Sequence, residues 1–113
     1  MIDQPITIFR GVSFGPLYVH AKDTAGAPYN LTGWSSLAQV RRLISGELLA
    51  TLSSVISDAP NGIITVTLDQ ATTTALAEEV AEWDLVLVTN TSVRLGPFIG
   101  GQAHITDPIT IFP

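Results

Sequence analysis

Short runs of alternating apolar and polar residues, each ended by a turn signal, constrain the fold of this chain most strongly. In residues 17–22, Leu17 and Val19 alternate with Tyr18 and His20. A period of two places successive side chains on opposite faces of a β-strand. Because this pattern recurs along the chain, the sequence predicts a β protein whose strands each bury one face.

The predicted strands are separated by Gly, Pro, Asn and Asp. They cover residues 6–10, 17–22, 34–43, 48–56, 63–69, 83–89, 93–99, 102–106 and 109–112. The strongest turn is at residues 58–62, because Asn61-Gly62 tolerates the positive φ of a tight turn. Residues 83–89 are apolar on both faces, which predicts a central strand covered on both sides.

Residues 70–82 are the only candidate helix, because threonines at 72–74 can cap it and good helix formers follow. Seven to nine short strands at a spacing of roughly ten residues are typical of an antiparallel β-sandwich. We therefore expect one all-β domain over residues 1–113, Ig-like or jelly-roll-like, with at most one short helix. A small, partly open barrel is the second possibility.

The balance of residue types narrows the possible partners. Hydrophobic residues make up 46% of the 113 residues. A domain this small has little interior, so part of its apolar surface is expected to meet a partner. The net charge is −5 and the five basic residues are scattered, whereas nucleic-acid binding needs a basic stripe. No apolar run can span a bilayer, and the first residues lack a secretion signal. Neither nucleic acid nor a membrane is an expected partner.

The pentapeptide Pro-Ile-Thr-Ile-Phe occurs twice, at residues 5–9 and 108–112. Its β-branched and aromatic residues favour a strand, and the proline stands at the first position, where its missing N–H costs least. The repeat has two interpretations. It is either a coincidence of the small β-strand alphabet, or it marks two terminal strands that are presented to neighbouring molecules.

Several motifs, taken in chain order, resemble those of a phage protein family. They are Phe-Arg-Gly at 9–11, Lys-Asp-Thr-Ala-Gly-Ala-Pro-Tyr-Asn-Leu-Thr-Gly at 22–33, Ala-Gln-Val-Arg at 38–41, Asp-Ala-Pro-Asn-Gly-Ile at 58–63 and Trp-Asp-Leu at 83–85. This order is similar to that of the N-terminal β-sandwich domain of phage baseplate upper proteins. The resemblance covers about residues 8–110, and Gly-x-Pro-x-x-Leu-Thr-Gly is its most distinctive part. Val12-Ser13 stands where the family often has Asp-Thr.

The resemblance implies a non-enzymatic structural protein of the virion. It implies self-association, with a homotrimer favoured, and docking onto other phage structural proteins of the tail or baseplate. A head decoration (cement) protein that stabilises the capsid is the alternative location. A small carbohydrate-binding host-adsorption module is the rival from another class, with Trp34, Tyr18 and Tyr29 as its candidate aromatics.

Chemistry-bearing residues are few, and no cofactor or metal is expected. With no cysteine, a zinc site would have to add carboxylates to the two histidines, His20 and His104. His20 is expected to face solvent or an interface. The acidic cluster of Glu78, Glu79, Glu82 and Asp84 lacks the alternating spacing of a calcium loop. No Gly-x-Ser-x-Gly elbow is present, so an enzyme is not expected.

Two further features have structural interpretations. Arg41 and Arg42 are adjacent and face opposite sides of a strand. One is expected to face outward, and the other to lie along an edge or to pair with a carboxylate such as Asp84 or Asp69. Leu31, in the stretch 26–33, is expected to plug the core.

The candidate interface consists of edge-strand backbone groups and outward apolar side chains. Its residues are Ile6, Ile8, Phe9, Tyr18, Phe98, Ile109, Ile111 and Phe112.

From the sequence alone, removal of residues 1–9 or of residues 108–113 is expected to reduce assembly while the remaining sandwich stays folded. The mass in solution of each truncated chain measures this effect. Unchanged assembly would contradict the interface interpretation of the two termini.

Overall fold

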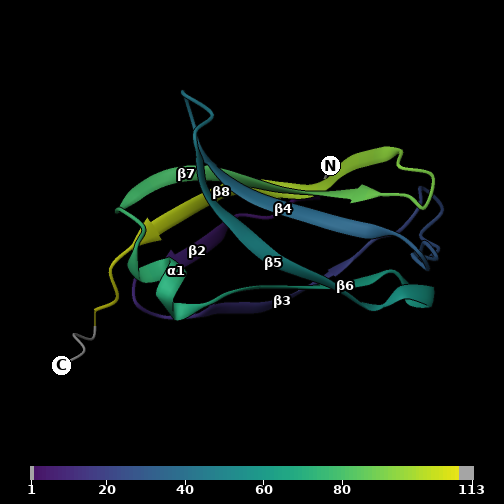
Figure 1. The fold of residues 1–113 in the computed structure, drawn as a ribbon, viewed down its shortest axis with the longest axis horizontal. Coiled ribbons are helices and arrows are strands. Elements are labelled where there is room, and N and C mark those ends of the chain that lie inside the picture. The colour runs from purple at the N-terminus through teal and green to yellow at the C-terminus, as the bar shows by residue number, and fades with distance from the viewer. Residues whose placement is uncertain (1, 110–113) are drawn as a thin grey trace.

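The structure, a computed structural model, describes residues 2–109. Within this range the strands are β1 (Ile2–Asp3), β2 (Ile6–Phe9), β3 (Phe14–His20), β4 (Ser35–Arg42), β5 (Leu48–Asp58), β6 (Ile63–Leu68), β7 (Glu79–Val88) and β8 (Arg94–Thr106). A 3-10 turn, η1 (Ala59–Asn61), and one short helix, α1 (Gln70–Thr74), lie between strands (Figure 1). The predicted all-β fold with at most one short helix is confirmed.

The strands form one curled sheet in the order β1-β8-β7-β4-β5-β6-β3, and β2 also pairs with β8. The long strand β5 makes the curl, because residues 48–52 pair with β4 and residues 53–58 pair with β6. Two layers result (Figure 1). The front sheet contains β1, β2, β8, β7, β4 and the first half of β5; the back sheet contains the second half of β5, β6 and β3.

The strand order matches an immunoglobulin sandwich. In such a sandwich, strands B, E and D pair in one layer and strands C, F and G pair in the other. Here β3, β6 and β5 occupy the first set of positions, and β4, β7 and β8 occupy the second. The A position beside strand B is not filled by any strand within residues 2–109, because the N-terminal strands pair with β8 instead.

Alternate side chains from both sheets fill the interior, as the period of two predicts. The largest fully buried side chains are Ile8, Leu31, Val40, Ile64, Val66, Thr73, Leu85, Leu87 and Ile105. Leu31 is 1% exposed, which confirms the predicted core plug. The buried indole of Trp83 donates from Nε1 to the backbone oxygen of Gln4 at 2.8 Å. This hydrogen bond ties the centre of β7 to the N-terminal arm.

The N-terminal pentapeptide is part of the core. β2 pairs in parallel with β8, with Ile6 opposite Ala103 and Ile8 opposite Ile105. Ile6 and Ile8 are 7% and 0% exposed, so the expectation that they face outward is wrong. Strand alternation turns them inward and leaves Phe9, at 45% exposure, on the outside. The expectation that the sandwich stays folded without residues 1–9 is revised accordingly, because this truncation deletes two core side chains.

The helix predicted over residues 70–82 is wrong beyond Thr74. Asp69 accepts a hydrogen bond from the Thr72 amide at 2.8 Å and caps α1, and hydrogen bonds from Thr72 lower the pKa of Asp69. The chain then extends, Leu76 enters the core, and β7 begins at Glu79. Pairing of β7 with β4 and β8 thus overrides the helix propensity of these residues.

Two strand predictions are also corrected. The strands predicted over 93–99 and 102–106 are one strand, β8, which begins at Arg94. In it Gly100 lies so close to β7 that an added Cβ would stand 2.4 Å from the Trp83 carbonyl oxygen. β7 is central, as predicted, but its second face is not covered, because Glu82 is exposed and Val86 only half-buried. Of the strand predicted over 109–112, only Ile109 is described, in a bend after β8, and Ile111 and Phe112 lie outside the described residues.

Replacement of Ile8 by alanine is expected to lower the free energy of unfolding by about 2–5 kcal/mol, because it leaves a cavity where β2 meets β8. Urea unfolding measures this loss. The control is Thr7→Ala on the exposed side of the same strand, with an expected change of about 0.5 kcal/mol or less. Equal effects of the two substitutions would show that β2 is not held in this register.

Candidate interaction surfaces

Two sheet edges are open along one side of the sandwich. Among the described residues, β2 pairs only with β8, and β3 pairs only with β6. Because residues 10–13 connect β2 directly to β3, the two open edges lie on the same side, one in each layer (Figure 1). An open edge presents backbone N–H and C=O groups to which another strand can pair.

A groove of about 700 Å³, here called the seam groove, lies along this side. It is lined by Ile2 of β1, by Val19 and His20 of β3, by the first part of β8 and by part of the loop 22–29. Tyr29 forms much of its aromatic wall, since its ring packs edge-on against Phe98 at 5.6 Å and lies 6.1 Å from Trp34. The seam groove therefore combines apolar side chains with an open strand edge, and Lys22 and Asp23 add two charged side chains to its lining.

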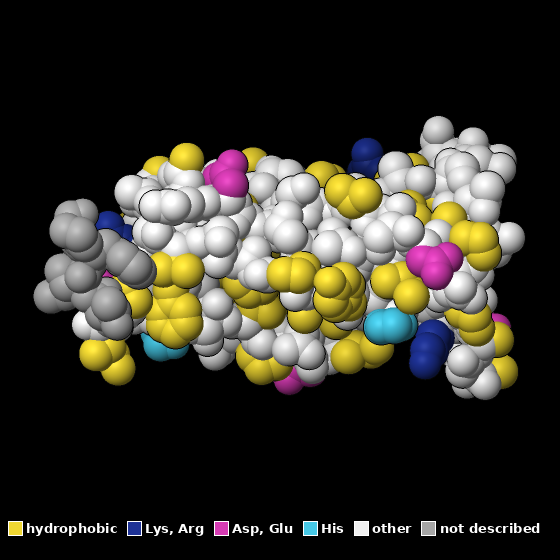
Figure 2. Space-filling view, turned by 90° about the horizontal axis from the view of Figure 1, so that it is seen from below, with side chains coloured by type: hydrophobic (Ala, Val, Ile, Leu, Met, Phe, Trp, Pro, Cys, Tyr) yellow, Lys and Arg dark blue, Asp and Glu magenta, His cyan; other side chains and the backbone are white. Residues whose placement is uncertain are grey.

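The outer side of the back sheet carries almost no charge. β3, β5 and β6 together contain one charged residue, Asp58, although 13% of the chain is charged. We call this surface the hydroxyl face; its residues are Tyr18, His20, Ser53, Val55, Ser57, Ile63, Thr65 and Thr67. Figure 2 views the molecule from this side and shows polar uncharged and hydrophobic side chains across the middle, with charges toward the rims.

Cross-strand pairs organise the hydroxyl face. Val55 and Tyr18 both lie opposite Thr65, so the three residues form one row across β5, β6 and β3. Val55 is 58% exposed and Tyr18 is 60% exposed. The Thr65 hydroxyl donates to Ser57 Oγ at 2.9 Å. Hydroxyls that bond to one another leave a surface that costs little to desolvate compared with one that carries ionised groups.

The predicted interface residues do not form one patch. Phe9 and Tyr18 are exposed on different sheets, Ile109 is fully exposed after β8, and Phe98 is half-buried in the wall of the seam groove. Sequence reasoning missed several exposed apolar residues: Leu37, Leu43, Ile44, Leu48, Val55, Val80 and Val93. The sequence does carry a signal for Ile44, because this apolar residue lies between the strands predicted over 34–43 and 48–56, where no strand face buries it.

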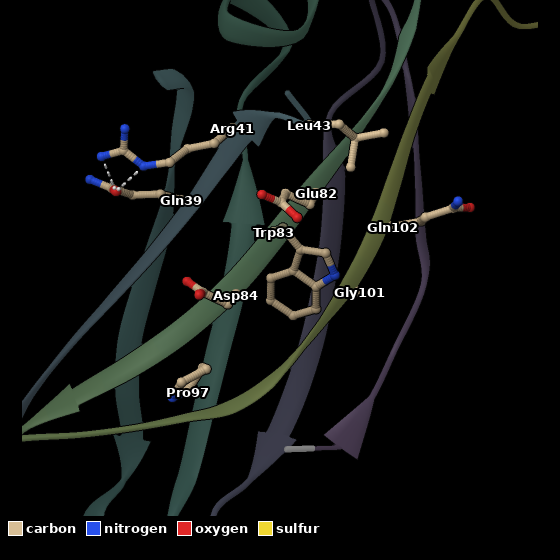
Figure 3. Close-up of a pocket in the computed structure, with 9 residues that line it drawn as sticks. All are labelled: Gln39, Arg41, Leu43, Glu82, Trp83, Asp84, Pro97, Gly101 and Gln102. Carbon is tan, nitrogen blue, oxygen red and sulfur yellow. Dashed lines mark hydrogen bonds between the residues drawn. The ribbon is translucent and has the colours of Figure 1, made fainter. Parts of the chain in front are cut away.

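A second groove, of about 480 Å³, crosses the outer side of the front sheet. Figure 3 shows Glu82 and Asp84 projecting from β7 between Gln102 on one side and Gln39 and Arg41 on the other. Arg41 lies opposite Glu82 in the sheet register, yet its Nη2 donates to Gln39 Oε1 at 2.8 Å and its Nη1 to the Gly46 backbone oxygen at 2.9 Å. These contacts fix the guanidinium at the rim of an open, shallow, polar depression.

Arg42 forms ion pairs, but with other carboxylates than the sequence predicts. Its Nε and Nη2 contact the two carboxylate oxygens of Glu79 at 3.0 and 3.1 Å, and its Nη1 contacts Glu47. The predicted partners Asp84 and Asp69 are therefore wrong, because the register of β4 on β7 brings Glu79 to this end. The hydrogen bonds from Arg42 lower the pKa of Glu79, and Glu79 and Glu47 raise the pKa of Arg42.

The remaining candidates are separate. His20 and His104 are both exposed, as expected for His20. Between residues 2 and 109, no three His, Cys, Asp or Glu side chains gather as a metal site would require. In the same range, none of the helices has the length and apolar character needed to cross a bilayer.

No protein-family model matches the chain, and no curated protein matches it.

The Arg42–Glu79 pair predicts a pH dependence. A lowered pKa in the folded state stabilises the fold above the ordinary carboxyl pKa of 4.5, and this contribution is lost as the pH falls through the folded value. The urea midpoint of Glu79→Gln is therefore expected to fall less than that of the wild type on acidification from about pH 7 to about pH 3. Glu78→Gln, at an exposed neighbour, is the control; identical pH profiles for wild type and Glu79→Gln would contradict the assignment.

Proposed function

We propose that this protein is a non-enzymatic structural component of a bacteriophage virion. It serves as an assembly or adaptor protein of the tail or baseplate. It self-associates, with a trimer favoured, and docks onto other virion proteins through its strand edges and apolar surface. The resemblance to the N-terminal β-sandwich domain of baseplate upper proteins and the immunoglobulin-like strand order support this proposal.

The uncharged hydroxyl face is the observation that carries the proposal. Cores of protein–protein interfaces are depleted in charged residues and enriched in aromatic residues such as tyrosine. The row formed by Val55, Thr65 and Tyr18 has this composition, and it continues to the open edge of β3. Charged side chains on an exposed sheet prevent one molecule from associating with another. The hydroxyl face lacks this protection, which favours a surface that is covered by a partner.

The open edges provide the second support. Soluble β proteins commonly protect an edge strand with lysine, proline or a bulge. In β3, Pro16 and a register shift between Phe14 and Leu17 protect the first part only. From Leu17 to His20 the strand is regular and carries no Lys, Arg, Asp or Glu. This half of the edge is suited to pairing with another protein.

The aromatic residues give less support to a carbohydrate-binding module. Glycan platforms present exposed aromatic rings, whereas Tyr29 and Trp34 are half-buried and pack against each other. Tyr18 is the exposed one of the three candidates and lies on the hydroxyl face. A baseplate location and the head-decoration alternative differ in where the protein's density lies on an intact particle, and that observation separates them.

A charge placed in the hydroxyl face is expected to weaken association. Val55→Lys puts an ammonium group where a partner would have to desolvate it, so the oligomer of 12.0 kDa protomers should dissociate at concentrations at which the wild type stays assembled. Sedimentation velocity measures the species present. Val93→Lys is a matched control, since Val93 is 51% exposed in a turn outside this face and Val55 is 58% exposed. A wild type that is monomeric at all concentrations and binds no virion protein would overturn the proposal.

A further inference from the structure

We infer that residues 108–112 of one copy add as a β-strand to the free edge of β3 in a second copy, with Ile109 and Ile111 directed into the seam groove. This inference rests on the proposed self-association. It names the segment and the edge through which one copy holds the next.

The donor segment is identical to a strand whose packing is known. Residues 5–9 and 108–112 both read Pro-Ile-Thr-Ile-Phe. In the N-terminal pentapeptide, residues 6–9 form β2, which buries Ile6 and Ile8 and leaves Thr7 and Phe9 outside. The sequence Ile-Thr-Ile-Phe can therefore form an edge strand with an apolar inner face. In the C-terminal pentapeptide, Ile109 is fully exposed.

Among the described residues, the end of β8 offers the donor segment no free edge. At the end of β8, Thr106 lies opposite Phe9 of β2, and Ile105 lies opposite Glu79 of β7, so both edges of β8 are occupied. Asp107 is the single residue between β8 and Pro108, and it is held by Arg10 at 2.8 Å.

The connection to the same chain's β3 is also too short. The chain needs residues 10–13 to pass from the end of β2, at Phe9, to the start of β3. Asp107 alone cannot make that turn, because even the tightest common reversals between strands use two residues. A second copy can supply the acceptor without any such reversal.

The acceptor edge has backbone groups available for pairing. The Ala21 amide donates to the Gly62 oxygen at 2.8 Å, on the side of β3 that faces β6. Successive residues of a strand direct their backbone groups to opposite sides, so those of Val19 also face β6 and those of Tyr18 and His20 face the open edge. These are the groups with which an added strand would form its ladder.

The acceptor position also has an apolar floor. The seam groove beside this edge is lined by Val19, Phe98 and Ile99, against which two isoleucine side chains can pack. In the immunoglobulin arrangement, a first strand occupies the position beside the strand equivalent to β3. The incoming segment would fill that position and complete the back sheet.

Two full-length double variants test which face of the segment is buried. Ile109→Asp with Ile111→Asp places two carboxylates in the seam groove and is expected to weaken self-association about 100-fold or more. Thr110→Asp with Phe112→Asp adds the same charge on the opposite face and is expected to change the dissociation constant less than about threefold. Sedimentation equilibrium measures both. Equal losses for the two variants, or no loss for the first, would overturn the inference.

Disulfide trapping tests the acceptor, because the natural chain contains no cysteine. A Thr110→Cys copy mixed with a Tyr18→Cys or His20→Cys copy is expected to form a mixed disulfide dimer, since neighbouring strands bring the Cα atoms into the required range. Ser53→Cys, on the same face but on β5, is the control partner and should not be trapped. Failure to trap either β3 cysteine excludes this edge. If the wild type associates while both tests fail, strand addition is wrong and the proposed function stands. A wild type that never associates overturns the inference, and it overturns the proposed function as well only if it also binds no virion protein.

Discussion

The pairing of the N-terminal strand with β8 determines the rest of this structure. A first strand in an immunoglobulin-like sandwich can join either layer, and here β1 and β2 join the front sheet in parallel with the last strand. Ile6 and Ile8 bury their side chains there, and the Trp83 indole bonds to the backbone between the two strands. The front sheet gains an edge strand as a result, and within residues 2–109 β3 has no strand on its outer side.

The pairing of β1 and β2 with the front sheet, and not with β3, connects the fold to the proposed function. The back sheet combines an open edge, an adjacent apolar groove and a face without charged side chains. Each feature alone is common in β proteins, but together they describe a surface that lacks the usual protection against pairing. The polar groove on the front sheet is different, because Glu82 and Asp84 project into an open depression where Arg41 is held by Gln39 and Gly46. Charged side chains thus line the groove on the front sheet, whereas the strands of the back sheet contain one charged residue, Asp58.

Most of the fold could be predicted from the sequence, because alternation and turn residues are local signals. The inward faces of β3 and β6 and the plug at Leu31 followed from them. Strand partners could not be predicted in the same way. Nothing local in residues 5–9 indicates that Ile6 and Ile8 pack against β8, so the sequence alone predicts that they face outward. For the same reason Glu79 was placed in a helix and not beside Arg42. The hydroxyl face was missed because it emerges only when β3, β5 and β6 lie side by side.

The central claim is that the edge of β3 between Leu17 and His20 is a pairing site. Amide hydrogen exchange at Tyr18 and His20, followed by NMR as the protein concentration is raised, tests this claim most directly, because it observes the backbone groups themselves. The account predicts that these two amides exchange freely in the dilute protomer and become protected on assembly, while the Val19 amide is protected throughout. Free exchange at Tyr18 and His20 in a fully assembled sample would contradict it.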